Sequence, residues 1–134
     1  MALNLLLDSG VANLVALHRA DAVARLAVAG RVYVPDIALG ELYYGAYVYA
    51  HAHSSAKYLD IYDAFYQQFL SRVLHPNEDT FRVCAAISAE LKTKGAPIQQ
   101  NDMWIAALAR QYGLTFATLD SDFTRVSSLQ IELW

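Results

Sequence analysis

The chain has 134 residues, of which 56% are hydrophobic and 17% are charged, and its formal net charge is −3. This length and composition exclude an intrinsically disordered protein and predict a single globular domain over residues 1–134. A negative net charge provides no general attraction for nucleic acid, which is bound mainly through lysine and arginine. The one cysteine, Cys84, permits no disulfide within the chain, which suits a reducing cytoplasm.

The beginning of the chain shows no targeting signal. Its apolar run is too short for a signal peptide and has no basic region before it. No apolar stretch in the sequence is long enough to span a membrane. We therefore expect a cytoplasmic protein without membrane attachment.

Strand-like and helical segments alternate along the chain. Short apolar runs predict buried strands, and segments with helical periodicity lie between them, often closed by glycine. In chain order we predict a strand at 3–7, helices at 11–18 and 21–29, a strand at 31–34, a long helix from 36, a helix at 56–71, a strand at 73–75, a helix at 76–94, a helix at 102–113, and strands at 114–119 and 129–133. This alternation indicates an α/β fold with a mostly parallel sheet.

Four acidic residues stand in apolar or tightly structured sequence, where an unpaired carboxylate is costly. Two of them follow predicted parallel strands, whose carboxyl ends meet at the edge of the sheet where ligands bind. A third opens a helix, where the helix dipole favours an anion. The fourth shares an otherwise apolar helix face with Ile37 and Tyr44, so we expect it to point into the fold. In that order they are Asp8 and Asp120, Asp102, and Glu41.

Carboxylates that converge on one point repel each other unless a cation lies between them. Sites made only of carboxylates select hard cations, so we expect Mg²⁺ or Mn²⁺. One such ion can lower the pKa of a bound water and direct it at phosphorus, and a second can stabilise the leaving oxygen. The pattern therefore predicts a metal-dependent phosphodiesterase whose catalytic and metal-binding residues are Asp8, Glu41, Asp102 and Asp120.

Each acid also has a structural interpretation that involves no metal. Asp8 could cap the helix that follows it, and Asp102 could simply be a favourable anion in a first helical turn. Glu41 could pair with a core arginine such as Arg31 or Arg82. The acids after the last buried strand would, on their own, be ordinary turn residues. It is the occurrence of all four together that favours the metal site.

The segments around these acids resemble the PIN domain, and more closely the VapC-type toxins of bacterial toxin–antitoxin pairs. The resemblance covers nearly the whole chain. It implies a PIN-like three-layer α/β/α sandwich with a mostly parallel central sheet flanked by helices. It also implies an Mg²⁺-dependent endoribonuclease that dimerises and is silenced by a cognate antitoxin. The segments that carry the resemblance are Leu5–Ser9, Tyr33–Ala46, Ile98–Ala107 and Ala117–Phe123.

Two positions differ from the family pattern. The first acid of the family is usually followed by Ser or Thr and then by Asn, whereas here Ser9 precedes Gly10. At the fourth acidic position we expect Asp120 to be the ligand and Asp122 an outer contributor. Ser9 and Asn101 are expected to orient water, metal or substrate.

The region between Tyr43 and Phe69 is unusually rich in aromatic residues, which are enriched in the cores of interfaces. One interpretation is a well-filled core. The other is a groove between two helices that receives a helix of the antitoxin, in which case Tyr47→Ala or Tyr62→Ala should weaken neutralisation. The residues concerned are Tyr43, Tyr47, Tyr58, Tyr62, Phe65, Tyr66 and Phe69.

Two other functions compete with the nuclease. The first alternative is a catalytically weak PIN scaffold, impaired by Gly10, that binds RNA or a protein partner without cleavage. A phosphohydrolase acting on small metabolites is disfavoured because the first strand is not followed by an Asp-x-Asp motif and the chain has no glycine-rich phosphate loop. Metal-dependent cleavage of RNA distinguishes the nuclease from the scaffold.

Overall fold

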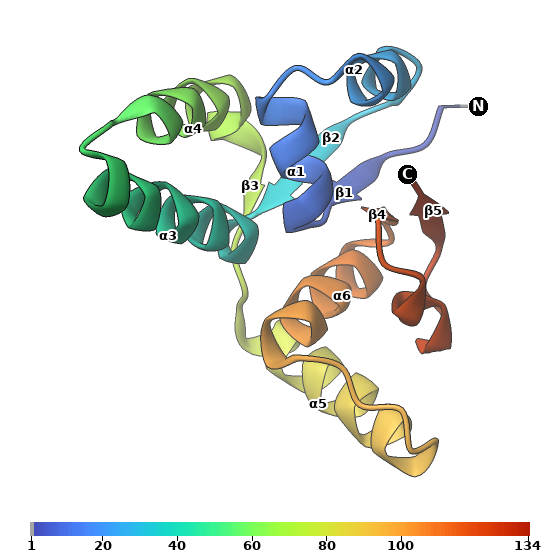
Figure 1. Ribbon diagram of the computed structural model, residues 1–134. Coiled ribbons are helices and arrows are strands. Elements are labelled where there is room, and N and C mark those ends of the chain that lie inside the picture. The colour runs from blue at the N-terminus through green and yellow to red at the C-terminus, as the bar shows by residue number, and fades with distance from the viewer. Residues whose placement is uncertain (1) are drawn as a thin grey trace.

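Five short strands form one parallel sheet at the centre of the computed structural model, which describes residues 2–134 (Figure 1). Hydrophobic residues at most strand positions place the sheet inside the protein. The strands are β1 (Leu5–Leu7), β2 (Val32–Pro35), β3 (Val73–Leu74), β4 (Thr115–Thr118) and β5 (Ile131–Leu133). Their order in space is β3-β2-β1-β4-β5, so β1 lies at the centre.

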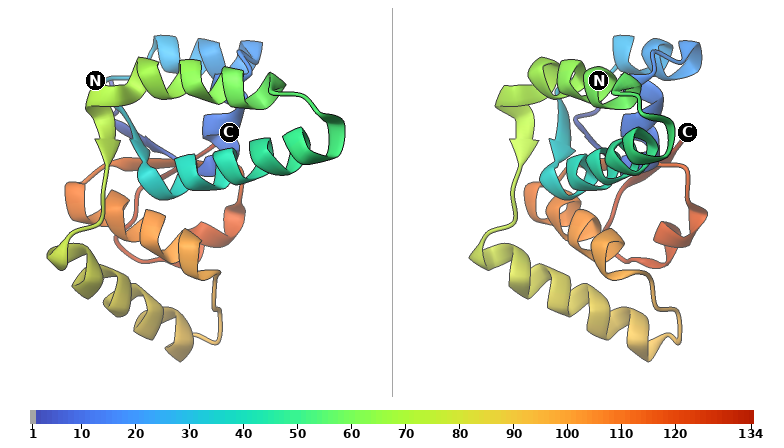
Figure 2. Two further views of the ribbon diagram at one scale, coloured as in Figure 1. Left: turned by 90° about the vertical axis from the view of Figure 1, so that its left-hand side faces the viewer. Right: turned by 60° about the vertical axis from the view of Figure 1, so that its left-hand side comes forward.

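Helices cover both faces of this sheet, which confirms the predicted α/β sandwich. Helices α5 and α6 pack together on one side, while α1 packs with the hairpin of α3 and α4 on the other (Figure 2). Within residues 2–134 the α-helices are α1 (Ser9–Ala16), α2 (Ala20–Ala27), α3 (Asp36–His53), α4 (Lys57–Phe69), α5 (Glu78–Thr93) and α6 (Gln100–Tyr112). Two short 3₁₀ helices, η1 (Leu70–Arg72) and η2 (Ser121–Arg125), complete the described part.

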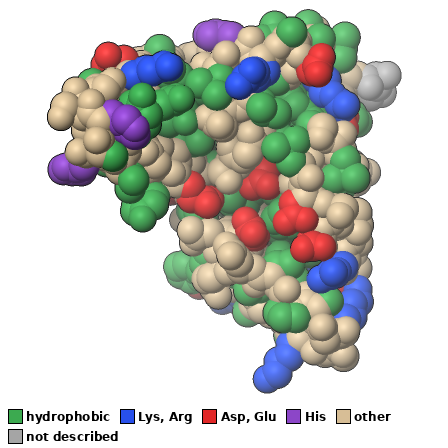
Figure 3. All heavy atoms as spheres, in the orientation of Figure 1, with side chains coloured by type: hydrophobic (Ala, Val, Ile, Leu, Met, Phe, Trp, Pro, Cys, Tyr) green, Lys and Arg blue, Asp and Glu red, His purple; other side chains and the backbone are tan. Residues whose placement is uncertain are grey.

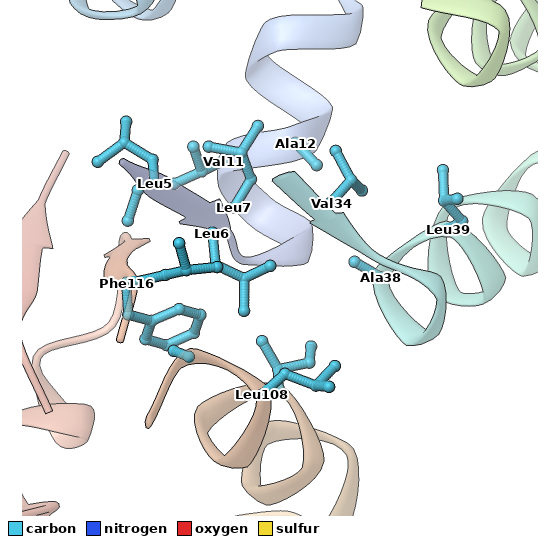
Figure 4. Packing of buried hydrophobic residues seen from close by; sticks show 14 of the residues in the cluster. Leu5, Leu6, Leu7, Val11, Ala12, Val34, Ala38, Leu39, Leu108 and Phe116 are labelled. Atoms are coloured by element: carbon cyan, nitrogen blue, oxygen red, sulfur yellow. The ribbon is translucent and has the colours of Figure 1, made fainter. Parts of the chain in front are cut away.

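The central strand β1 is apolar throughout because both faces of the sheet are covered. All three of its leucines are buried. Side chains alternate between the two faces of a strand, and Figure 4 shows Leu6 directed toward Leu108 of α6 while Leu7 lies beside Val11 of α1. The same three-residue strand therefore joins both helical layers into one core.

Two local features differ from the sequence-based expectation. Helix α6 begins at Gln100 rather than Asp102. Its N-cap residue is Gln99, whose side chain makes no capping hydrogen bond. Asp102 is therefore the third residue of α6 and still lies in its first turn. The 3₁₀ helix η2, stabilised by the buried ring of Phe123 against Phe116, was not predicted.

None of the helices formed by residues 2–134 combines the length and the hydropathy needed to cross a membrane.

Candidate active site

The order of the strands reverses at β1, and this places a crevice at one edge of the sheet. The chain adds β2 and β3 on one side of β1, then returns to add β4 and β5 on the other. Ligands of open α/β sheets bind at such a switch point, beyond the carboxyl ends of the strands. Because Leu7 is in register with Ala117, the residues that follow β1 and β4, including Asp8 and Asp120, leave the same edge.

Asp8 is the most deeply placed of the four acids, with 7% of its surface exposed. Its Oδ1 accepts a hydrogen bond from the Ser9 backbone N–H at 2.8 Å, and its Oδ2 accepts one from the Thr118 hydroxyl at 2.7 Å. Burial raises the pKa of Asp8, and the charge of Asp120 raises it further, against the lowering effect of the two hydrogen bonds. Asp8 also caps α1, as its structural interpretation predicts, and its role as a metal ligand stays a prediction.

Thr118 has a role at this site that the sequence analysis missed. It is fully buried at the end of β4, and its hydroxyl fixes the orientation of the Asp8 carboxylate. The same hydroxyl accepts a hydrogen bond from the Asp120 backbone N–H at 3.1 Å. A threonine at the end of the strand paired with β1 was the available signal, since its hydroxyl must find a buried partner.

Asp102 reaches the same edge from the other direction, because α6 runs antiparallel to the strand that it precedes. Its side chain is half-buried in the first turn of the helix. Burial, followed by the charges of Asp8 and Asp120, raises its pKa to about 6. A carboxyl group with this pKa holds its proton far more readily than an isolated aspartate does.

The apolar neighbours of Glu41 led us to expect that it points into the fold, and this prediction is wrong. Glu41 is exposed and lines a surface hollow together with Ile37 and Tyr44, the two residues expected to share its helix face. Partial desolvation raises its pKa, followed by the charges of Asp102 and Asp8. The Ser9 hydroxyl acts in the opposite direction, by favouring the charged carboxylate.

Neither Arg31 nor Arg82, the arginines that could have paired with Glu41, forms an ion pair with it. Arg82 pairs with Glu78 and Asp79 on its own helix. Among the ion pairs that residues 2–134 form, none involves Glu41 or Arg31. Glu41 therefore remains available to a ligand.

The four acids form one electrostatic cluster. The charge of Asp120 affects the pKa of both Asp8 and Asp102, and the charges of Asp8 and Asp102 affect that of Glu41. Figure 3 shows acidic side chains gathered in the middle of one face of the molecule. The fold thus assembles carboxylates from the N-cap of α1, from α3, from α6 and from the turn after β4, which are far apart in the sequence.

Asp122 lies in the same turn as Asp120 but is engaged differently. Its backbone N–H donates to Oδ1 of Asp120 at 2.8 Å, and its carboxylate pairs with Arg125 at 3.3 Å. The charge that affects Asp8 and Asp102 is that of Asp120. This geometry favours Asp120 as the fourth acid and gives Asp122 a part in shaping the turn.

The remaining predicted residues lie at the rim of the cluster. Asn101 is exposed and lines the same hollow as Glu41. At Gly10, a Cβ atom would come within 3.2 Å of the Leu119 side chain. A side chain at position 10 would therefore require the end of the Leu119 side chain to shift by a few tenths of an ångström.

The donor chemistry of the cluster fits a hard divalent cation, although the metal site itself stays a prediction. Within the described chain, no three His, Cys, Asp or Glu side chains are already arranged to hold a metal ion. Carboxylates with raised pKa values repel each other, and a cation between them would relieve that repulsion. Mg²⁺ needs only one or two carboxylates, because it keeps several of its waters.

The aromatic residues of α3 and α4 divide into two groups. Tyr62, 7% exposed, donates its hydroxyl to Asn13 Oδ1 at 2.7 Å and belongs to the core, as do Phe65 and Phe69. Others face a second hollow of about 500 Å³ between α3, α4 and β3. That hollow is lined by residues that include Tyr43, Tyr66, Asp36, Asp63 and His75. The core interpretation therefore holds for part of this region, and the antitoxin groove stays a prediction.

The fold and the acids define an α/β protein with a carboxylate-lined candidate active site, and known proteins match it. The family model for the PIN domain matches residues 5–129. Ribonuclease VapC2 of Haemophilus influenzae is 35% identical over 109 residues, which cover 79% of this chain and 77% of the relative. Among solved structures, DNA-bound VapBC from Salmonella typhimurium matches with a TM-score of 0.85 and 26% identity over 98% of each chain. FitAcB from Neisseria gonorrhoeae matches with a TM-score of 0.76 and 27% identity over 95% of each chain.

The chain belongs to the PIN-domain family, and its likeness to the VapC-type proteins of that family is confirmed.

The raised pKa of Asp102 predicts that this carboxylate destabilises the metal-free protein at neutral pH. The folded chain binds the Asp102 proton more tightly than the unfolded chain does. The stabilisation that comes from this tighter proton binding is fully present below pH 3.8 and is lost as pH rises through about 6. Asp102→Asn should therefore raise the free energy of unfolding at neutral pH by roughly 1–2 kcal/mol, after allowance for solvent screening.

Denaturant unfolding in EDTA, with wild type and Asp102→Asn compared across the acidic to neutral range, measures this effect. The difference between the two proteins should grow as pH rises. Asp60→Asn, at an exposed acid in the first turn of α4, is the matched control and should give no gain. A variant no more stable than wild type at neutral pH contradicts the prediction.

Proposed function

We propose that the chain is a ribonuclease toxin of a toxin–antitoxin pair and that it hydrolyses RNA phosphodiester bonds with the help of Mg²⁺ or Mn²⁺. The observation that carries the proposal is the cluster of four carboxylates at the switch point of a PIN fold, three of them with raised pKa values. The names of its relatives, which are VapC ribonucleases and VapBC complexes, support the same activity.

Asp8, Asp102, Asp120 and Glu41 would hold the cation. When bound, the cation would neutralise negative charge on the phosphate and promote ionisation of a water molecule. The chain's own contribution is to fix the geometry: the Ser9 N–H and the Thr118 hydroxyl hold the Asp8 carboxylate in one orientation. We expect products with a 3′-hydroxyl and a 5′-phosphate, as the family resemblance implies.

A scaffold that binds RNA or a protein partner without cleavage is the second candidate, and the observation that favours it is at Gly10. Gly10 supplies no side chain where the family pattern has a polar one, and the nearest atoms to a Cβ built there belong to the apolar side chain of Leu119. The four acids and their orienting hydrogen bonds are nevertheless all present, which favours the nuclease.

We also propose that an antitoxin binds over the hollow between α3, α4 and β3. Its lining carries two aspartates beside two tyrosine rings, and the Tyr43 hydroxyl donates to Asp63 Oδ1 at 2.6 Å. A segment with a basic side chain among apolar ones would complement this surface. The relatives solved as VapBC complexes support the existence of a protein partner, and we propose a homodimer as the state that binds it.

Cleavage of RNA should depend on the acids and on the cation. Asp8→Asn and Asp102→Asn should each lower the cleavage rate by about 100-fold or more, and EDTA should abolish wild-type cleavage. Thr118→Val, which leaves Asp8 unoriented, should lower the rate by roughly tenfold. The measurement is cleavage of structured RNA with Mg²⁺ and then with EDTA.

Asp60→Asn serves as the control for the loss of one negative charge, and its rate should equal that of wild type. Cleavage that survives both Asp8→Asn and Asp102→Asn would point to a contaminating nuclease or another site. If no form cleaves but wild type still binds RNA, the scaffold is the better description.

Binding of the cognate antitoxin should depend on the hollow between α3 and α4. Tyr66→Ala and Asp63→Asn should each weaken antitoxin binding by about tenfold while leaving RNA cleavage unchanged, because these side chains line the hollow and lie outside the acid cluster. Tyr62→Ala, the change suggested by the sequence, is unsuitable because Tyr62 is buried. Isothermal titration calorimetry measures the affinity, with Tyr112→Ala as the control, and equal affinities for all variants would exclude this surface.

A further inference from the structure

A surface hollow of about 440 Å³, a volume typical of small-ligand sites, is lined by Glu41, one of the four acids. Two of its lining residues, Glu41 and Asn101, already have a place in the proposed reaction. Three others, Ile37, Gly40 and Tyr44, come from one face of α3 and have none. The hollow therefore adjoins the acid cluster at Glu41, and its remaining wall has no part in the proposed reaction.

Tyr44 is the largest side chain in this hollow, and 74% of its surface is exposed. It follows Glu41 by three residues, which corresponds to a rise of about 4.5 Å along the helix. Several other tyrosines of the hairpin pack their rings against aromatic neighbours, as Tyr43 does with Tyr62 and Tyr49 with Tyr58. Tyr44 belongs to none of the aromatic pairs formed by residues 2–134, so its exposed ring is available to a ligand in the hollow.

Gly40 is a second, independent feature of the same wall. Glycine inside a helix lowers stability relative to alanine, so its presence calls for a reason. A glycine can permit the close approach of a neighbouring backbone, but a Cβ atom built at Gly40 would meet no atom within 4 Å among the described residues. Packing within the chain therefore does not require glycine here. Its effect is to leave the helix backbone bare beside Glu41, one turn before Tyr44.

We propose that Tyr44 and Gly40 form a stacking platform for one unpaired nucleobase of the RNA, next to the phosphate that reacts at the acids. This inference rests on the proposed function. The residues known to line the hollow include no lysine or arginine, so its affinity for RNA cannot come from neutralising phosphates. Stacking of a base on an aromatic ring supplies affinity without charge and requires an unstacked, single-stranded nucleotide.

A protein occupant is the competing explanation for an exposed aromatic ring. The presence of Glu41 in the wall of the hollow favours a nucleotide, because the base beside the reacting phosphate must lie close to the acids. The glycine also favours a flat ligand, since a bare backbone lets a planar ring approach the helix where a Cβ would hold it away.

The test measures binding of a fluorescein-labelled single-stranded RNA of mixed sequence by anisotropy, with Mg²⁺, in the Asp102→Asn background so that the RNA is not cut. Tyr44→Ala should raise Kd by about 5- to 100-fold, and Tyr44→Phe should stay within about twofold, because stacking needs only the ring. In the cleaving protein, the same Tyr44→Ala change should raise KM. Tyr112→Ala, at a tyrosine 45% exposed at the far end of α6, should alter neither.

Glycine variants separate a binding role from a structural one. Gly40→Ala should raise Tm, as alanine favours the helix, and should nevertheless raise Kd. Gly45→Ala is the matched control, because Gly45 is also inside α3 with no atom within 4 Å of a built Cβ but does not line the hollow. It should raise Tm and leave Kd unchanged.

The outcomes distinguish this inference from the function on which it rests. If wild type cleaves RNA but Tyr44→Ala changes neither Kd in the Asp102→Asn background nor KM in the cleaving protein, the platform is wrong and the nuclease stands. If Gly40→Ala and Gly45→Ala both weaken binding and both change the oligomeric state by light scattering, this face is an interface between copies and the platform is overturned. If wild type neither binds nor cleaves RNA, the proposed function and the platform are both wrong.

Discussion

Repulsion between carboxylates at the β1–β4 edge is the constraint on which the rest of the structure depends. Asp8, Glu41 and Asp102 all hold their protons more tightly than isolated acids because they are desolvated and close to each other's charge. Such a cluster opposes folding unless something compensates it. The compensation begins within the chain, where hydrogen bonds from Ser9 and Thr118 stabilise the most buried carboxylate. A bound cation would complete it.

The scaffold supplies the remaining stability from layers that lie away from the acids. The leucines of β1 pack on both sides of the sheet, and the aromatic pair of Phe116 and Phe123 holds the turn that carries Asp120. The same repulsion shapes the proposed function, because an anionic RNA meets an acidic mouth. Affinity for RNA must then come from a cation and from uncharged contacts. We assign the uncharged contacts to the stacking platform of Tyr44 and Gly40.

Sequence patterns predicted the fold well because the signals are local. The leucine run of β1 and the glycine that closes α6 mark element ends directly, so the parallel α/β order could be predicted before the structure was known. The gathering of the four acids followed from topology, since strand ends of a parallel sheet share an edge. Side-chain contacts between distant segments could not be predicted. Thr118 orients Asp8 across 110 residues of sequence, and the exposure of Glu41 depends on how α3 packs against α6.

The most direct test of the central claim is to locate the cation. Crystals grown with Mn²⁺ and measured near its absorption edge give an anomalous map in which the metal is identified independently of activity. The proposed function predicts a strong peak among the carboxylates of Asp8, Asp102 and Asp120, absent from Asp8→Asn crystals grown in the same way. Mn²⁺ bound only elsewhere, or a cluster that stays metal-free with its carboxylates protonated, would contradict it.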